Sequence, residues 1–256
     1  MGLFAYLCYM GKCRLYIVAH KPVEYGIPWD SVVKPIQVGN GEKFLDLRDN
    51  VGDNISEWNP LYAEGTATYW IWKHLPDVDY IGQMQYRRRF PFNEDTDFDE
   101  IFSKYDVIAT EPLRNVGTVR VQYSSSHNRE DITLLEKIIG EKYPELVDRV
   151  KEILDGTALY YSNGFIMRTA DFVNYCEFLF GILDEFKARK GWDTMDKAYT
   201  DIVSEIKSNR RKGNRGVNYQ CQVLAFLSER IWTIYLLSHF NNIYEVKYKL
   251  MENSGI

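Results

Sequence analysis

The sequence predicts a mixed α/β fold, with a mixed central sheet and a mainly helical C-terminal part. Strand and helix patterns alternate over the first two thirds of the chain, whereas the last third is mostly helical. The chain has 256 residues, of which 45% are apolar and 15% aromatic, and this is enough for a packed core. We therefore expect residues 1–256 to form a single α/β sandwich domain.

Charge and cysteine content restrict the function classes. A net charge of -5 and a pI near 5.5 argue against general nucleic-acid binding, which needs a surplus of lysine and arginine. The four cysteines show neither zinc-site spacing nor the density of a disulfide-rich secreted protein, which predicts reduced thiols in the cytoplasm. No window reaches the roughly 18 apolar residues of a membrane span, so any membrane contact should be peripheral.

Two short strands are predicted first. Residues 15–19 are apolar and rich in β-formers, which indicates a buried strand that ends at His20. Residues 32–38 indicate a second strand, and Pro35 within it favours an edge position because proline cannot donate a ladder hydrogen bond. The glycine- and asparagine-bearing residues 39–54 follow as a loop.

A helix is predicted to begin at Asn59-Pro60 and to run to about His74. Asparagine at the N-cap and proline at the first helical position together start a helix well. On this helix Glu64 shares a face with apolar side chains at helical spacing. A carboxylate on such a face must be paired, or it must face a cavity.

The remaining elements follow from periodicity and composition. Further strands are expected at three places, namely 79–82, 105–109 and 160–167, and an acidic polar loop at 93–100. Helical patterns cover three segments, namely 127–154, 170–187 and 219–238. The polar and basic segment 188–218 predicts a mobile loop. Its basic side chains are a candidate contact for anionic lipid head groups, with a solvated loop as the alternative: Lys207, Arg210, Arg211, Lys212 and Arg215.

Three consecutive arginines, Arg87 to Arg89, follow a predicted core strand and Tyr86. The planar guanidinium pairs bidentately with phosphate oxygens, so this segment could neutralise a diphosphate leaving group. The alternative is a solvated charge run that is balanced by the acidic residues after it.

Polar side chains also gather just before and at the start of the first helix. They are Asp53, Asn54, Ser56 and Asn59. A helix N-terminus suits an anion or sugar hydroxyl groups. Turn and capping chemistry is the alternative for these residue types, but it does not require four of them.

Metal and acid/base candidates are weaker. Asp77 and Asp79 form a D-x-D triplet, but they precede their strand, which places them at the wrong end of the sheet. We therefore assign no metal-ligating residue, and a Mg or Mn ion stays open as a cofactor. His127 and Asp131, spaced four apart at a predicted helix start, are a candidate acid/base pair or a capping pair.

A series of motifs, in order along nearly the whole chain, resembles a known family. The motifs are IVAHK at 17–21, PIQVG at 35–39, GDNIS at 52–56, YWIWK at 69–73, YIG at 80–82 with YRR at 86–88, QY at 122–123 with His127 and Asp131, NGFIM at 163–167 and LSER at 227–230. They resemble a bacterial family from capsular and exopolysaccharide loci, long catalogued as a domain of unknown function. Its members are regarded as glycosyltransferases, some of them galactofuranosyltransferases.

The resemblance implies a GT-A-like nucleotide-sugar fold and transfer of a hexose from a UDP-sugar. It also implies a lipid-linked oligosaccharide acceptor at the inner face of the cell membrane. Segment 85–89 would lie where other enzymes carry D-x-D, so Arg87 and Arg88 would stabilise the departing diphosphate. Glu229 is expected to hold Arg230 or another arginine in place.

The site candidates combine residues singled out by their patterns with residues of the matching motifs. Three carboxylates are candidates for the catalytic base, with His127 as a possible acid/base partner: Asp53, Glu64 and Asp131. The substrate-binding candidates are His20, Lys21, Asn54, Ser56, Asn59, Gln85, Tyr86, Arg87, Arg88, Asn163, Glu229 and Arg230. Two departures from the family pattern stand out. Gln85 replaces a usual histidine, and residues 1–14 form an N-terminal extension.

Two other functions stay open at this point. The first is a non-catalytic sugar- or nucleotide-binding module, which Gln85 and the lack of a metal motif favour. The second is a metal-dependent hydrolase built around His20, Asp53 and His127.

Overall fold

The computed structural model of the protein describes residues 12–23, 29–114, 117–212 and 215–251. Its six-stranded central sheet has the order β2-β1-β3-β8-β5-β9. The strands of this sheet are β1 (Cys13–Ala19), β2 (Val33–Gln37), β3 (Tyr80–Gln85), β5 (Val107–Thr110), β8 (Phe165–Arg168) and β9 (Ile243–Val246). β1 pairs in parallel with β2 and β3, whereas β8 runs antiparallel to β3 and β5. The predicted mixed α/β fold is therefore confirmed.

Two further ladders are short. They join β4 (Arg88–Arg89) to β10 (Lys249–Leu250), and β6 (Leu113–Arg114) to β7 (Ala158–Leu159). Two 3-10 turns, Ser56–Trp58 and Pro144–Leu146, precede helices. The helices are α1 (Asn59–Tyr62), α2 (Gly65–Lys73), α3 (Phe98–Phe102), α4 (Val119–Ser126), α5 (Arg129–Lys142), α6 (Val147–Asp155), α7 (Thr169–Lys190), α8 (Met195–Lys207), α9 (Val217–Cys221) and α10 (Val223–His239).

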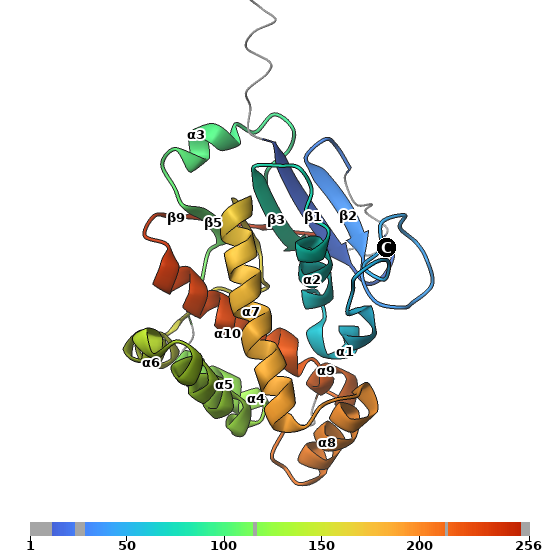
Figure 1. Ribbon diagram of the computed structural model, residues 1–256, viewed down its shortest axis with the longest axis vertical. Helices are drawn as coiled ribbons and strands as arrows, with labels where there is room; N and C mark the ends of the chain where they lie inside the picture. Colours follow the sequence, from blue (N-terminus) through green and yellow to red (C-terminus); the bar gives the residue numbers. More distant parts are fainter. Residues whose placement is uncertain (1–11, 24–28, 115–116, 213–214, 252–256) are drawn as a thin grey trace, which may run out of the picture.

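The sheet is covered on both faces, and β1 shows why. Its residues alternate between the two faces, as a strand requires. Tyr16 and Val18 pack into the larger core with α2, α7 and α10, whereas Leu15 and Ile17 pack into a smaller core with α3. In Figure 1, α2 and α7 lie in front of the sheet, and α8 and α9 lie below α1.

Most of the predicted elements near the sheet are present, with shifted ends. β1 begins at Cys13, two residues before the predicted start, and β2 lies at the sheet edge as Pro35 suggested. The loop predicted at 93–100 contains the start of α3, because the Asp97 side chain caps it by accepting from the Glu100 N–H at 2.9 Å. Most of the extension 1–14 lies outside the described residues, apart from 12–14.

The single helix predicted from Asn59 to His74 is wrong. Ala63 has a φ of 46°, which ends α1 and makes α2 start anew at Gly65. Asn59 is not an N-cap, since it has helical dihedral angles, and its side chain donates to the Ala63 carbonyl at 2.8 Å. The break leaves Glu64 at the corner between the two helices.

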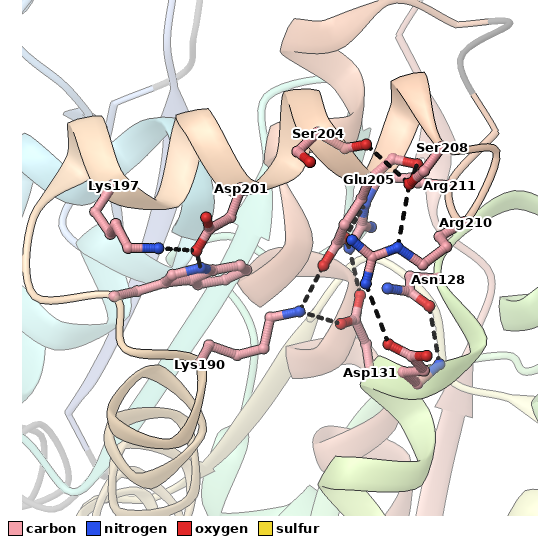
Figure 2. Close-up of polar contacts among 12 residues, drawn as sticks. Asn128, Asp131, Lys190, Lys197, Asp201, Ser204, Glu205, Ser208, Arg210 and Arg211 are labelled. Carbon is pink, nitrogen blue, oxygen red and sulfur yellow. Dashed lines mark hydrogen bonds and ion pairs between the residues drawn. The ribbon is translucent and has the colours of Figure 1, made fainter.

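The mobile loop predicted at 188–218 is also wrong for the described part. This segment contains α8, and Arg211 beyond it is 1% exposed. Figure 2 shows the reason: Arg211 binds Asp131 at 2.5 Å and Glu205 at 2.8 Å, and Lys190 binds Glu205 at 2.7 Å. We call these four residues the ion cluster. A buried arginine in such a cluster cannot contact lipid head groups, so the predicted five-residue lipid contact loses this member.

The cysteines and helices add two findings. Cys13, Cys176 and Cys221 are buried free thiols. Across the described ranges, no helix has the length and apolar character needed to cross a membrane.

Candidate active site

A cavity of about 800 Å³ opens at the carboxyl ends of β1, β2 and β3. Val18 and His20, Val38, and Gln85 line it from these three strand ends. From β1 the chain passes to β2 on one side and later to β3 on the other, so the cavity lies at a topological switch point. Open α/β sheets bind ligands at such points.

The arginine segment forms the basic wall of this cavity. Arg87 and Arg88 line it, and within the described ranges neither forms an ion pair with a carboxylate. β10 holds the segment in place, and the Met251 N–H donates to the Arg87 carbonyl at 2.8 Å. The Arg88 guanidinium also lies 5.2 Å from the centre of the Tyr161 ring. The positive charge of this wall is therefore held in place and available to an anionic ligand.

Glu64 lies between α1 and α2 and contacts Gln85 at the carboxyl end of β3. Its Oε1 accepts from Gln85 Nε2 at 2.9 Å and from Asn163 Nδ2 at 3.2 Å. The Glu64 backbone N–H gives the carboxylate a further hydrogen bond, and the side chain lines the cavity. Burial raises the pKa of Glu64, although the two amide donors and Arg88 oppose that effect. A carboxylate that is held by hydrogen bonds and lines the cavity is suited to accept a proton from a bound ligand.

Gln85 connects these two groups. Its Oε1 accepts from Arg88 Nη1 at 2.6 Å, while its Nε2 donates to Glu64. A neutral histidine can likewise accept with one ring nitrogen and donate with the other. Glutamine can therefore serve in both roles at a position where the resembled family usually has histidine.

A left-handed turn lies between the cavity residue Tyr161 and β8. Ser162 and Asn163 have φ angles of 69° and 48°, which are uncommon for residues other than glycine. The Ser162 N–H donates to Glu229 Oε1 at 3.0 Å, and this bond holds the turn. Burial raises the pKa of Glu229 to about 7, against the opposing effect of Arg230. Arg230 donates to Glu229 Oε2 at 2.9 Å, in agreement with the expectation that Glu229 holds this arginine.

His20 and Tyr86 line the cavity beside Arg87. Their rings meet edge to face with centroids 5.4 Å apart. Burial lowers the pKa of His20, and the positive charges of Lys21 and Arg87 lower it further. The His20 ring is therefore uncharged at neutral pH, and it can act as a hydrogen-bond donor or acceptor. Lys21 is exposed and does not line the cavity.

The polar cluster at 53–59 is mainly turn chemistry. Asp53 is exposed and accepts from the Tyr69 hydroxyl, while the Asn54 side chain accepts from the Ser56 N–H in a local turn. Only Asn59 of the four predicted residues lines the cavity.

Asp49, which was not predicted as a site residue, holds this loop together through hydrogen bonds to its side chain. It is fully buried, and its Oδ1 accepts from the Ser56 hydroxyl at 2.7 Å and the Gly39 N–H at 3.1 Å. Gly39 has a φ of 79°, and an added Cβ would lie 2.9 Å from the Asn59 side chain. A glycine at this position thus allows the loop to approach Asn59 closely.

His127 and Asp131 do not reach the cavity. Asp131 is fully buried in the ion cluster, and His127 is 4% exposed, with its ring stacked 4.1 Å from that of Phe226. A buried carboxylate in two ion pairs cannot collect a proton from a ligand in the cavity, so we do not assign a catalytic role to it. The hydrolase arrangement is also contradicted, because only His20 of its three residues lines the cavity.

His127 should make stability pH-dependent. Burial lowers its pKa from 6.5 to about 3, so the native state keeps it neutral. Below pH 6.5 this histidine binds a proton in the unfolded chain but not in the native state. The free energy of unfolding therefore falls as the pH falls. The expected loss at pH 5 is about 2 kcal/mol.

Urea unfolding at pH 7 and pH 5 tests this, with His127→Gln as the comparison. Carboxyl groups whose pKa is raised in the native state have the opposite effect on the free energy of unfolding. This effect is the same in both proteins, so it cancels when their pH dependences are subtracted. Equal pH dependence in both would contradict a buried neutral histidine.

Side chains of metal-ligating types do not form a cluster in the described residues. These residues contain no group of three histidine, cysteine, aspartate or glutamate side chains that could hold a metal ion. Asp79 lies before β3, at the opposite end from the cavity, and accepts from the Lys12 N–H at 2.8 Å.

Several cavity residues were not predicted as site residues. They are Tyr161, Met195, Asp196, Tyr199, Asn218, Tyr219 and Gln222. The Ser-Asn-Gly triplet at 162–164 was a usable signal for Tyr161, because these residue types tolerate left-handed turns. The others lie in or next to helices that pack onto the cavity from far along the chain.

Comparisons with known proteins agree with this fold. The apo structure of the WbbM bifunctional glycosyltransferase has a TM-score of 0.68 and 24% sequence identity to this chain. The match covers 94% of this chain and 46% of that protein, so the chain spans about half the length of WbbM. Among curated proteins, none matches the sequence. The family described as domain of unknown function DUF4422 matches residues 14–206. Because this match covers well over half of the chain, the protein belongs to that family.

Proposed function

We propose that the protein is a glycosyltransferase that moves a hexose from a nucleoside-diphosphate sugar to a hydroxyl group of a glycan acceptor. One observation carries the proposal: Arg88, Gln85 and Glu64 form a continuous hydrogen-bonded series in the cavity at the switch point. The series puts a cation for an anionic leaving group close to a carboxylate that can accept a proton. The likeness to the fold of a glycosyltransferase supports this assignment.

The proposed reaction is a direct displacement. The acceptor oxygen attacks the anomeric carbon of the donor, and the bond from that carbon to the diphosphate oxygen breaks. The hydroxyl proton passes to the carboxylate of Glu64, and the diphosphate leaves with the bonding electron pair. Arg87 and Arg88 stabilise the negative charge that develops on the diphosphate, without any step that requires a metal held by the protein.

The finer assignment rests on the motif resemblance. We propose UDP as the nucleotide, with galactofuranose among the candidate sugars, and a lipid-linked oligosaccharide as the acceptor in capsular or exopolysaccharide synthesis. The reaction would take place in the cytoplasm, with the GT-A-like cavity facing the inner membrane surface.

Arg88→Ala should strongly reduce donor use. We expect release of UDP from the preferred UDP-sugar to fall by about 10²–10³-fold, because the cation beside the leaving group is lost. The measurement is a coupled UDP-release assay, after calorimetric screening of UDP-galactofuranose, UDP-galactose, UDP-glucose and UDP-N-acetylglucosamine.

Arg114→Ala is the matched control, since this arginine is exposed on β6 and does not line the cavity. It should retain wild-type activity. Wild-type turnover by the Arg88 variant would refute the proposal. Tight donor binding by the wild type without any turnover would instead support the non-catalytic binding module.

A further inference from the structure

The cavity has two chemically different walls. The wall at the strand ends carries its basic side chains, Arg87 and Arg88. The wall formed by α8, α9 and the start of α10 carries amide, carboxylate and tyrosine side chains, and no lysine or arginine among its described lining residues. A nucleoside diphosphate fits the first wall. The second has carboxylates and no cation for a phosphate, so it suits a different, uncharged ligand.

Tyr199 is the first indication of that ligand. It is 46% exposed, although it lines the cavity, and within the described residues its ring makes no ring contact. The helix face behind it is fixed, because Ala198 and Ile202 are fully buried. An immobile helix that presents an open aromatic ring to a cavity offers a stacking surface for the apolar face of a sugar ring.

Three polar side chains line the cavity along the same wall as this ring. Asn218 and Gln222, four residues apart on α9 and its end, line the cavity, as does Asp196 on α8. None of the three side chains has a hydrogen-bond partner in the part of the chain that the structure describes. Amide and carboxylate groups together can both donate to and accept from neighbouring hydroxyl groups. This combination matches a neutral carbohydrate.

The wall is rigid at both ends of α8. At its C-terminal end the ion cluster joins it to α5 and α7, as Figure 2 shows. Just before its N-terminal end the buried Trp192 packs edge to face against Phe186 of α7, and its Nε1 donates to Asp201 of α8 at 3.2 Å. A preformed wall of this kind loses little conformational freedom when a ligand binds.

We propose that the wall of α8, α9 and the start of α10 binds the acceptor as a neutral sugar ring, stacked on Tyr199 and hydrogen-bonded by Asp196, Asn218 and Gln222. The assignment of this sugar as the acceptor rests on the proposed function. The binding site itself stands on the wall described above.

Saturation-transfer NMR on the full chain with UDP present tests the site. The probes are methyl glycosides of galactose, glucose, mannose and N-acetylglucosamine at millimolar concentration. We expect transfer to at least one probe, reduced roughly fivefold or more in Tyr199→Ala by loss of the aromatic contact. Tyr199→Phe should retain it because the ring remains. Thr200→Ala, an exposed neighbour outside the cavity lining, is the matched control and should behave as the wild type.

The outcomes separate this site from the donor site. Absence of transfer to every probe, or wild-type transfer in Tyr199→Ala, would overturn the sugar site. Calorimetric titration with UDP should give the same affinity for Tyr199→Ala and wild type, and an equal loss of UDP binding would also overturn it. If glycosides bind but no UDP-sugar is bound or turned over, the proposed function fails while the sugar site stands.

Discussion

Glu64→Gln is expected to lower the rate of sugar transfer by about 10²–10⁴-fold, the usual contribution of a general base. The amide retains the shape of the side chain, and its oxygen can still accept from Gln85 and Asn163. It cannot take the proton of the acceptor hydroxyl. UDP affinity should change little, so steady-state kinetics should show the loss in kcat.

Asp53→Asn is the matched control, because this competing carboxylate is exposed and lies outside the cavity lining. It should retain wild-type rates. Only the ionised form of Glu64 accepts a proton, and burial raises its pKa. The kcat of the wild type should therefore fall on acidification at a higher pH than it would if the base were an exposed glutamate. Equal losses in the two variants would remove Glu64 from the role of base.

Arg211→Ala is expected to destabilise the folded protein strongly. It would leave the buried Asp131 and Glu205 carboxylates without their arginine partner, which costs about 3–5 kcal/mol. The melting temperature should fall by about 10 °C for a chain of this size. Hydrogen exchange should accelerate in α8, because the cluster holds the end of this helix.

Arg210→Ala provides the comparison. The side chain of this adjacent arginine is 48% exposed, and it lies 3.7 Å from Glu130. An exposed ion pair contributes less than about 1 kcal/mol, so the melting temperature should hardly change. Similar shifts in both variants would mean that the ion cluster contributes no more than a surface pair.

The parts of the fold that were predicted correctly depend on local signals. β1 and β3 are apolar runs of strand length, α5 and α7 have clear helical periodicity, and Pro35 marked an edge strand. The arginine wall could be anticipated for a similar reason, since it directly follows a central strand. Glu64 was expected to need a partner or a cavity, and it has both, although the continuous helix face assumed in that reasoning is broken at Ala63.

The parts that were missed depend on contacts between distant residues. Nothing near Arg211 in the sequence indicates burial, because its partner Asp131 lies 80 residues earlier. The break at Ala63 was missed for the same reason. It places Glu64 in contact with Gln85 and Asn163, which are distant in the sequence. Asp53, Asn54 and Ser56 were predicted as site residues but do not line the cavity. Local sequence could not make this distinction, because the same residue types form turns and bind sugars.

The pairing of β10 with the arginine segment links the site to the order of protein synthesis. Lys249 and Leu250, which pair with the strand of Arg88, are made much later than that arginine. A nascent chain therefore carries its arginines without the strand that orients them. We expect nucleotide binding to arise only after Lys249 and Leu250 have left the ribosome and can form this ladder.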